Sequence, residues 1–191
     1  MALIAALLGW MFDGFELGLL PLVARPALQD MLSEAMKADP SIVDLWEGIW
    51  TAGFLVGMST GGVLFGWLGD RMGRVRAMTL SVFAYSVFSG VCCIARSPGE
   101  FFCYRFLAAL GMGGEWSLGV ALVMEIWPNK SRALLSGLIG AAANVGFLLV
   151  ALFALVLSSF IRSAEGGLLA IGLPQDWVSK LVANQGWRLL M

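Results

Sequence analysis

The sequence predicts an all-α polytopic membrane protein, and three observations support this. Hydrophobic residues make up 59% of the 191 residues and charged residues only 13%, whereas soluble domains carry about 25% charged residues. Several apolar stretches reach the roughly 20 residues that a helix needs to cross a bilayer. The chain also has 24 glycines, and small residues let helices pack closely in lipid.

Five full spans are expected within a single domain, 1–191, followed by the start of a sixth. The first span carries Asp13 and Glu16, lacks a basic leader and is longer than the apolar core of a signal peptide, so a transmembrane helix is expected there. The spans cover residues 2–23, 46–68, 78–95, 100–127 and 133–160, and a truncated sixth begins at about residue 187.

The polar segments between these spans predict loops. A loop over 161–185 is expected to hold a short interfacial helix, 176–184, whose apolar side is formed by Trp177, Leu181 and Val182.

Basic residues in the short loops predict the orientation, because such residues stay in the cytoplasm. The loop 69–77 carries three arginines, and the loop 128–132 carries Lys130 and Arg132. The loop 24–45 has more acidic than basic residues and is expected outside. The N-terminus is therefore predicted to be cytoplasmic.

Composition also excludes some functions. The net charge of −1 gives no reason to expect a nucleic-acid partner, and the absence of histidine removes the commonest zinc ligand. Cys92, Cys93 and Cys103 form no CxxC pair and are interpreted as packing residues, with a redox role as the alternative. No metal and no catalytic residue are predicted.

Two acidic residues in the first span are candidates for chemistry. Asp13 and Glu16 are three residues apart and share a helix face. A charge near the middle of a span costs about 2.5–3.5 kcal/mol, so such residues usually mark an ion or substrate route. A structural salt bridge to a neighbouring helix is the alternative.

The fourth and fifth spans carry further polar residues. Arg105 and Glu115 lie about 15 Å apart along one helix and on different faces, so they are not expected to neutralise each other. The glycines at 111–114 follow no strand, which argues against a nucleotide-binding loop. Asn144 is expected either to bond a neighbouring helix or to line a cavity.

The charged turn between the second and third spans resembles the signature loop of the major facilitator superfamily. The matching positions include Gly66, Asp70, Arg71, Gly73 and Arg74. The resemblance implies that the chain is the N-terminal six-helix half of such a transporter, with a C-terminal half that the chain does not contain. It also implies a gating role in which Asp70 pairs with Arg74. The alternative is that the arginines are only topology anchors.

The second span has a ridge of glycines at Gly53, Gly57 and Gly61. Two interpretations stay open. The ridge either packs within this bundle or, as the resemblance implies, faces the missing half.

Two further motifs resemble organic-anion–proton symporters of the superfamily. The run 13–16, Asp-Gly-Phe-Glu, is similar to the first helix of aromatic-acid symporters, and 111–116 is similar to the fourth helix of lactate, sialate and metabolite symporters. One departure is Ala109, where the superfamily often has glycine. The resemblance implies proton-coupled symport of a small organic anion, a monocarboxylate or similar metabolite, by alternating access. The implied cavity residues are Asp13, Glu16, Arg105, Glu115, Trp116 and Asn144, with Phe15 as a further apolar wall.

Other expectations follow from the same resemblance. The protein is expected to be no enzyme and to use no cofactor, with the proton as coupling ion. Its expected partners are the lipid bilayer and a small-molecule substrate, and its expected place is the plasma (inner) membrane. A sugar or polyol porter of the same superfamily is one alternative, and a truncated, non-transporting membrane fragment is the other.

Overall fold

The computed structural model describes residues 2–37, 39–126 and 129–191, and these are almost entirely helical. The all-α prediction is therefore confirmed. The helices are α1 (Ala2–Met31), α2 (Glu34–Lys37), α3 (Pro40–Met72), α4 (Arg74–Val91), the 3₁₀ turn η1 (Cys92–Ile94), α5 (Pro98–Ile126), α6 (Asn129–Ala170) and α7 (Gln175–Leu190).

Five of the helices are long and apolar enough to cross a membrane, as the sequence predicts. These candidate spans are Leu7–Met31, Pro40–Met72, Arg74–Ile94, Pro98–Glu125 and Leu134–Leu157. Residues 127 and 128, in the turn that was expected to be cytoplasmic, lie outside the described residues. The side chains of Lys130 and Arg132 do so too, and these two residues supported the predicted orientation.

The predicted loop over 24–45 is mostly helical, which corrects the sequence-based boundaries. The apolar run ends near Arg25, but this charge is compensated within the structure. Its guanidinium lies 2.6 Å from Asp44 and 3.0 Å from Glu47. The ion pairs connect the last turns of α1 to the start of α3, and α1 continues past Arg25 to Met31.

Helix α3 begins with a capped turn. Asp39 accepts hydrogen bonds from the backbone N–H of Ser41 at 2.9 Å and from its hydroxyl at 2.7 Å. These bonds favour the ionised carboxylate and lower the pKa of Asp39. Pro40 occupies the first helical position, where its missing N–H costs nothing.

The C-terminal part of the chain also differs from the prediction. Helix α6 continues to Ala170, through the first part of the predicted loop 161–185, and Gly172 (φ +86°) turns the chain back into α7. The predicted interfacial helix and the start of the sixth span form one helix. Trp177 is exposed and Leu181 and Val182 are half-buried, so the predicted apolar side stays a prediction. Val178 and Trp187 of α7 are each only 1% exposed.

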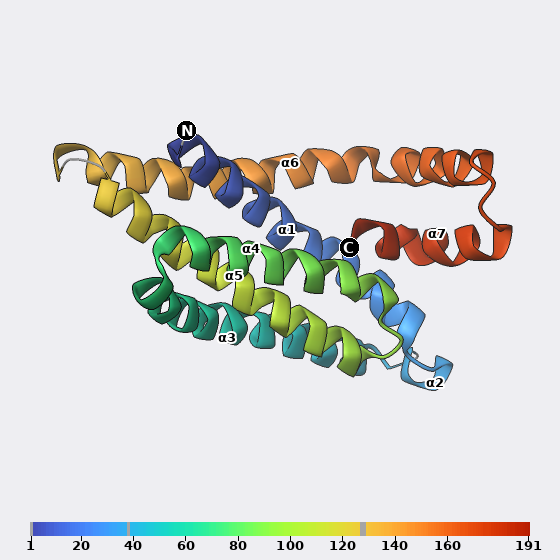
Figure 1. The fold of residues 1–191 in the computed structure, drawn as a ribbon. Helices are drawn as coiled ribbons and strands as arrows, with labels where there is room; N and C mark the ends of the chain where they lie inside the picture. Colours follow the sequence, from blue (N-terminus) through green and yellow to red (C-terminus); the bar gives the residue numbers. More distant parts are fainter. Residues whose placement is uncertain (1, 38, 127–128) are drawn as a thin grey trace.

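The helices form two groups that meet at α1 (Figure 1). Helices α3, α4 and α5 pack together, and α1 crosses them and packs along α6, while α7 folds back beside α6. The glycine ridge of α3 faces α5. A Cβ on Gly57 would lie 2.9 Å from Ala109 Cβ, and one on Gly61 would clash with the carbonyl of Leu110. Packing within this bundle is therefore the correct interpretation of the ridge.

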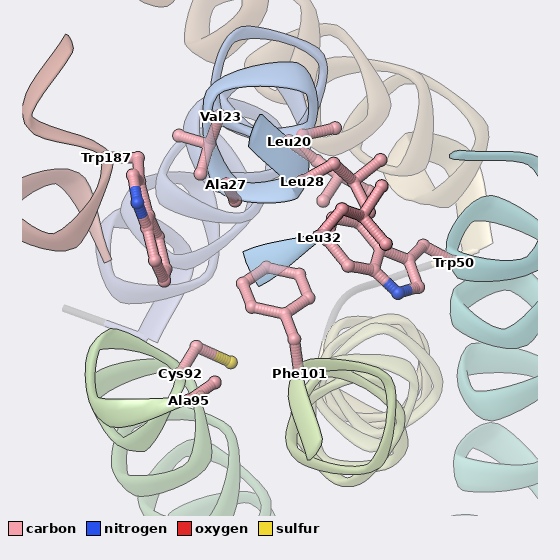
Figure 2. Packing of buried hydrophobic residues seen from close by; sticks show 11 residues of the cluster. Leu20, Val23, Ala27, Leu28, Leu32, Trp50, Cys92, Ala95, Phe101 and Trp187 are labelled. Atoms are coloured by element: carbon pink, nitrogen blue, oxygen red, sulfur yellow. The ribbon is translucent and has the colours of Figure 1, made fainter. Parts of the chain in front are cut away.

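The largest buried apolar cluster lies where five segments converge (Figure 2). Phe101 of α5 stands between Trp50 of α3 and Trp187 of α7, with ring centroids at 4.3 and 6.1 Å. Cys92 is fully buried in the same cluster, which confirms its packing role, whereas Cys103 is exposed. This cluster fixes the C-terminal part of α1 against α3, α5 and α7. It thereby helps to position Asp13 and Glu16, which lie in the preceding turns of α1. Its α1 members are Leu20, Val23, Ala24, Ala27 and Leu28.

Candidate functional site

An ion pair connects the first and fourth spans inside the bundle. Arg105 Nη1 lies 2.6 Å from Glu16 Oε1 and 3.1 Å from Ser89 Oγ, and the Ser89 hydroxyl donates to the same carboxylate oxygen. Arg105 is 1% exposed. The structural salt bridge that the sequence left open is thus present for Glu16, and three helices, α1, α4 and α5, contribute to it.

Two further carboxyl groups are buried near this pair. Asp13 is fully buried and Glu115 is 3% exposed. Neither oxygen of Asp13, nor Oε2 of Glu115, makes a hydrogen bond of good geometry among the described residues, although the Trp116 side chain lies close enough to interact with the Asp13 carboxyl group. Glu115 and Glu16 both lie close enough to Asp13 for their carboxyl groups to interact with it electrostatically. Three acids and a single arginine therefore share one interior region.

The position of Glu115 depends on a glycine of α1. A side chain on Gly9 would clash with Oε1 of Glu115, since the carboxyl group rests against the α1 backbone at that point. Asp13 and Gly9 are four residues apart and so lie on one face of α1. This geometry brings the two unpaired carboxyl groups to the same side of that helix.

Two tryptophans stack beside the acids. The rings of Trp10 and Trp116 are nearly parallel, with centroids 4.7 Å apart and an interplanar angle of 10°. Both indole N–H groups are buried; that of Trp10 has no acceptor among the residues described, and the Trp116 side chain interacts with the Asp13 carboxyl group. The two rings therefore place polar N–H groups and an apolar surface next to the buried acids.

The two remaining residues of the prediction, Asn144 and Phe15, differ in position. Asn144 is exposed on α6, and its amide donates at 3.4 Å to the carbonyl of Gly140 in its own helix, so it stands apart from the charged cluster. Phe15 lines an apolar cavity of about 410 Å³ with Phe153 and also lines the cavity beside Glu16. A cavity role for Asn144 stays a prediction.

The signature turn is tighter than the expected loop over 69–77. Only Gly73 separates α3 from α4, and its φ of +94° is a conformation that favours glycine. The predicted ion pair is present: Arg74 lies 2.7 Å from Asp70 and also 3.0 Å from Glu125 on α5. Its Nη1 approaches the carbonyl of Gly66 at 3.5 Å.

Arg71 has a different partner from Arg74. Its guanidinium lies over the ring of Trp67, 4.1 Å from the centroid. Arg74 thus connects helices α3, α4 and α5, while the contact of Arg71 with Trp67 lies within α3.

Sequence reasoning missed three contributors to these sites. Ser89, which bridges Arg105 and Glu16, is an ordinary small residue in an apolar span and gives no sequence signal. Trp10 lies three residues before Asp13 on the same helix face, so the helical period could have revealed it. Glu125 lies near the end of the expected fourth span, and its pairing with Arg74, 51 positions away in the sequence, depends on the tertiary structure.

The fold and the buried charged cluster define an integral membrane protein of the helical-bundle type, with ionisable groups held inside its spans. Comparison with family models identifies the family: residues 2–173 match the Major Facilitator Superfamily. The chain belongs to this superfamily.

Individual relatives are membrane transporters by name. The chain is 37% identical over 79% of its length to a putative metabolite transport protein of Haemophilus influenzae, and 30% identical over 92% to the niacin transporter NiaP of Acinetobacter baylyi. It is 29% identical over 78% of its length to the sialic acid transporter NanX of Escherichia coli. The chain spans only 35–38% of the length of these relatives.

A solved structure shows the same fold. The crystal structure of a bacterial homolog of the human lysosomal transporter Spinster, inward-facing and unoccupied, superposes with a TM-score of 0.75 at 24% identity. The match covers 99% of this chain and 38% of that one. The chain therefore matches rather more than a third of the length of these relatives and of the solved chain.

Proposed function

We propose that the chain forms the N-terminal half of a secondary active transporter that couples a small organic anion to a proton by alternating access. The observation that carries the proposal is the interior cluster of Asp13, Glu16, Glu115 and Arg105. Ionisable groups within membrane spans are costly, and they usually mark ion or substrate pathways. A cluster with unpaired carboxyl groups beside a cation offers places for both a proton and an anion.

The residues have distinct proposed roles. Asp13 or Glu115, which are buried and have no cationic partner among the described residues, holds the coupling proton. A protonated carboxyl group accepts a nearby anion that its ionised form would repel. Arg105 supplies the positive charge for that anion, and Trp116 and Phe15 supply apolar walls. Asn144 is proposed to reach the cavity from the exposed face of α6.

The names of two relatives support an acid as the substrate. One is a niacin transporter and the other a sialic acid transporter, and both compounds carry a carboxylate at neutral pH. A monocarboxylate or similar metabolite is therefore the proposed substrate class. No catalysis and no cofactor other than the proton is proposed.

A C-terminal six-helix half is the proposed partner. Within this chain, large apolar side chains are exposed on α3 and α6, including Val63 at 76% and Leu155 at 79%. Lipid and a second half would cover such surfaces. The proposed location is the plasma (inner) membrane, with the N-terminus and the α3–α4 turn in the cytoplasm, because that turn carries arginines.

Uptake under an imposed pH gradient tests the proposal. Cells that express the reading frame containing this chain should accumulate labelled niacin or sialic acid faster than cells that do not express it when the outside is acidic, and a protonophore should abolish the difference. Inhibition by hexoses rather than carboxylates would favour the sugar or polyol porter. Accumulation of none of these compounds would favour the non-transporting fragment.

A further inference from the structure

The ion pair inside the bundle suggests how an anion is recognised. We propose that Glu16 occupies, in the substrate-free site, the place on Arg105 that the carboxylate of the substrate takes during transport. This inference rests on the proposed anion transport. It specifies that Arg105 recognises the carboxylate of the substrate and that Glu16 competes with this carboxylate.

The first argument is that the pairing of Arg105 is incomplete. Only its Nη1 is engaged, by Glu16 and Ser89, while Nε and Nη2 are buried without a partner among the described residues. A guanidinium normally binds a carboxylate through two parallel hydrogen bonds. The single contact with Glu16 therefore leaves donors free for a carboxylate that approaches with better geometry.

The second argument concerns the direction of that approach. The ring of Phe54 lies under the guanidinium, with the Arg105 Cζ 4.9 Å from the ring centroid. One face of the cation is thereby covered, so a carboxylate must reach its edge, where the Glu16 carboxylate now lies. A carboxylate that binds this edge through two parallel hydrogen bonds needs Nη1, which Glu16 engages, so the two carboxylates are alternatives at that edge.

The third argument is that Glu16 has space to move. Its side chain is 15% exposed and lines a cavity of about 280 Å³ together with Tyr85, Ser86 and Ser89. The hydroxyl groups of these residues can receive a displaced carboxyl group. Ser89 belongs to both the cavity and the ion pair, so the cavity reaches the place where the exchange occurs.

The other charges of the cluster favour exchange over addition. The titratable groups that face the ion pair include Asp13 on α1, Glu115 on α5 and Tyr85 on α4, and none of them supplies a second positive charge. A substrate anion that entered while an ionised Glu16 stayed on Arg105 would place two carboxylates on one guanidinium. Displacement of Glu16 with uptake of a proton by its carboxylate keeps one carboxylate on one guanidinium and leaves the net charge of the region unchanged.

Binding to variants of the complete reading frame that contains this chain, purified in detergent, tests the exchange. The probe is benzoate, and benzamide at the same ionic strength is the neutral control. Glu16→Gln should bind benzoate at least tenfold more tightly than the wild-type chain, because the internal competitor has lost its charge. Arg105→Gln should bind none. Equal or weaker benzoate binding by Glu16→Gln would overturn the proposal.

Chemical rescue provides a second measurement. Glu16→Ala should unfold at a lower temperature than the wild-type chain, and benzoate, but not benzamide, should restore most of the loss. Asp44→Ala is the matched control, since it removes the carboxylate from an ion pair in which both side chains are 61% exposed. If benzoate raised the unfolding temperature of both variants equally, the proposed carboxylate-binding site on Arg105 would be contradicted.

The two proposals can fail separately. If uptake of carboxylates is observed but Glu16→Gln binds benzoate no better than the wild type, only the exchange on Arg105 is wrong. If the reading frame transports no carboxylate, the proposed function is wrong, whatever the binding measurement shows.

Discussion

Glu16 and Arg105 are 89 positions apart in the sequence, yet their carboxylate and guanidinium lie 2.6 Å from each other inside the helix bundle. The contact joins α1 to α5, and Ser89 brings α4 into the same arrangement. Among the described residues, the ion pair of Arg105 with Glu16 is the most deeply buried one. Loss of Arg105 would leave several buried acids uncompensated.

Removing the guanidinium should therefore be strongly destabilising. Arg105→Leu leaves Glu16 as a largely buried, unpaired charge, and breaking one side of a buried pair costs about 3–5 kcal/mol. Thermal unfolding in detergent measures the loss. Arg25→Leu is the control, because its ion pair is exposed and such pairs contribute about 0–1 kcal/mol. A similar loss in both variants would contradict the role of Arg105.

The crossing of α3 and α5 should tolerate no side chain at its closest point. A Cβ on Gly113 would clash with the carbonyl of Met58 on the facing backbone, so Gly113→Ala should lower the unfolding temperature. Gly137→Ala, at an open helical position with nothing within 4 Å of its Cβ, should be neutral or stabilising by up to about 1 kcal/mol. The same unfolding measurement distinguishes the two. Equal stability of both variants would mean that the helices are not in close contact there.

The turn between α3 and α4 should act on transport more than on stability. Arg74 contacts Asp70 and Glu125, whose side chains are 65% and 53% exposed, and such ion pairs contribute at most about 1 kcal/mol each. Arg74→Glu and Glu125→Arg should each slow uptake by the complete reading frame with little change in unfolding temperature. The double exchange should recover part of the rate. Absence of recovery would show that the Arg74–Glu125 pair is not the functional contact.

Helix α7 offers a matched pair of tryptophans. Trp187 is 1% exposed in the cluster of Figure 2, whereas Trp177 is 69% exposed. Trp187→Ala should cost about 3–5 kcal/mol, the range for removal of large aromatic side chains from a core. It should also increase maleimide labelling of Cys92, which the cluster now buries. Trp177→Ala should change neither quantity.

Much of the fold could be predicted because long apolar runs leave few alternatives in a membrane. Helix ends were less predictable. Arg25 signalled the end of a span, but its charge is paired with acids on α3, and α1 continues to Met31. The direction of the α3 glycine ridge depended on tertiary packing, and spacing alone did not distinguish α5 from a partner outside the chain.

For the candidate site, residue type was more informative than position. Asp13, Glu16, Arg105 and Glu115 could be recognised because ionisable residues in spans are rare. Which of them pair could not be predicted, since the contact of Glu16 with Arg105 depends on the crossing of α1 and α5. Ser89 carries no signal of its own, and Asn144, although polar and central in its span, lies on an exposed face.

The most direct test of proton coupling compares two transport modes of a Glu115→Gln variant of the complete reading frame. Glutamine keeps the size of the side chain but cannot bind and release a proton. The account predicts that uptake driven by a pH gradient is abolished, while exchange of labelled for unlabelled substrate across the membrane at equal pH continues. Uphill, pH-driven uptake at the wild-type rate would contradict the role of Glu115 as a coupling group.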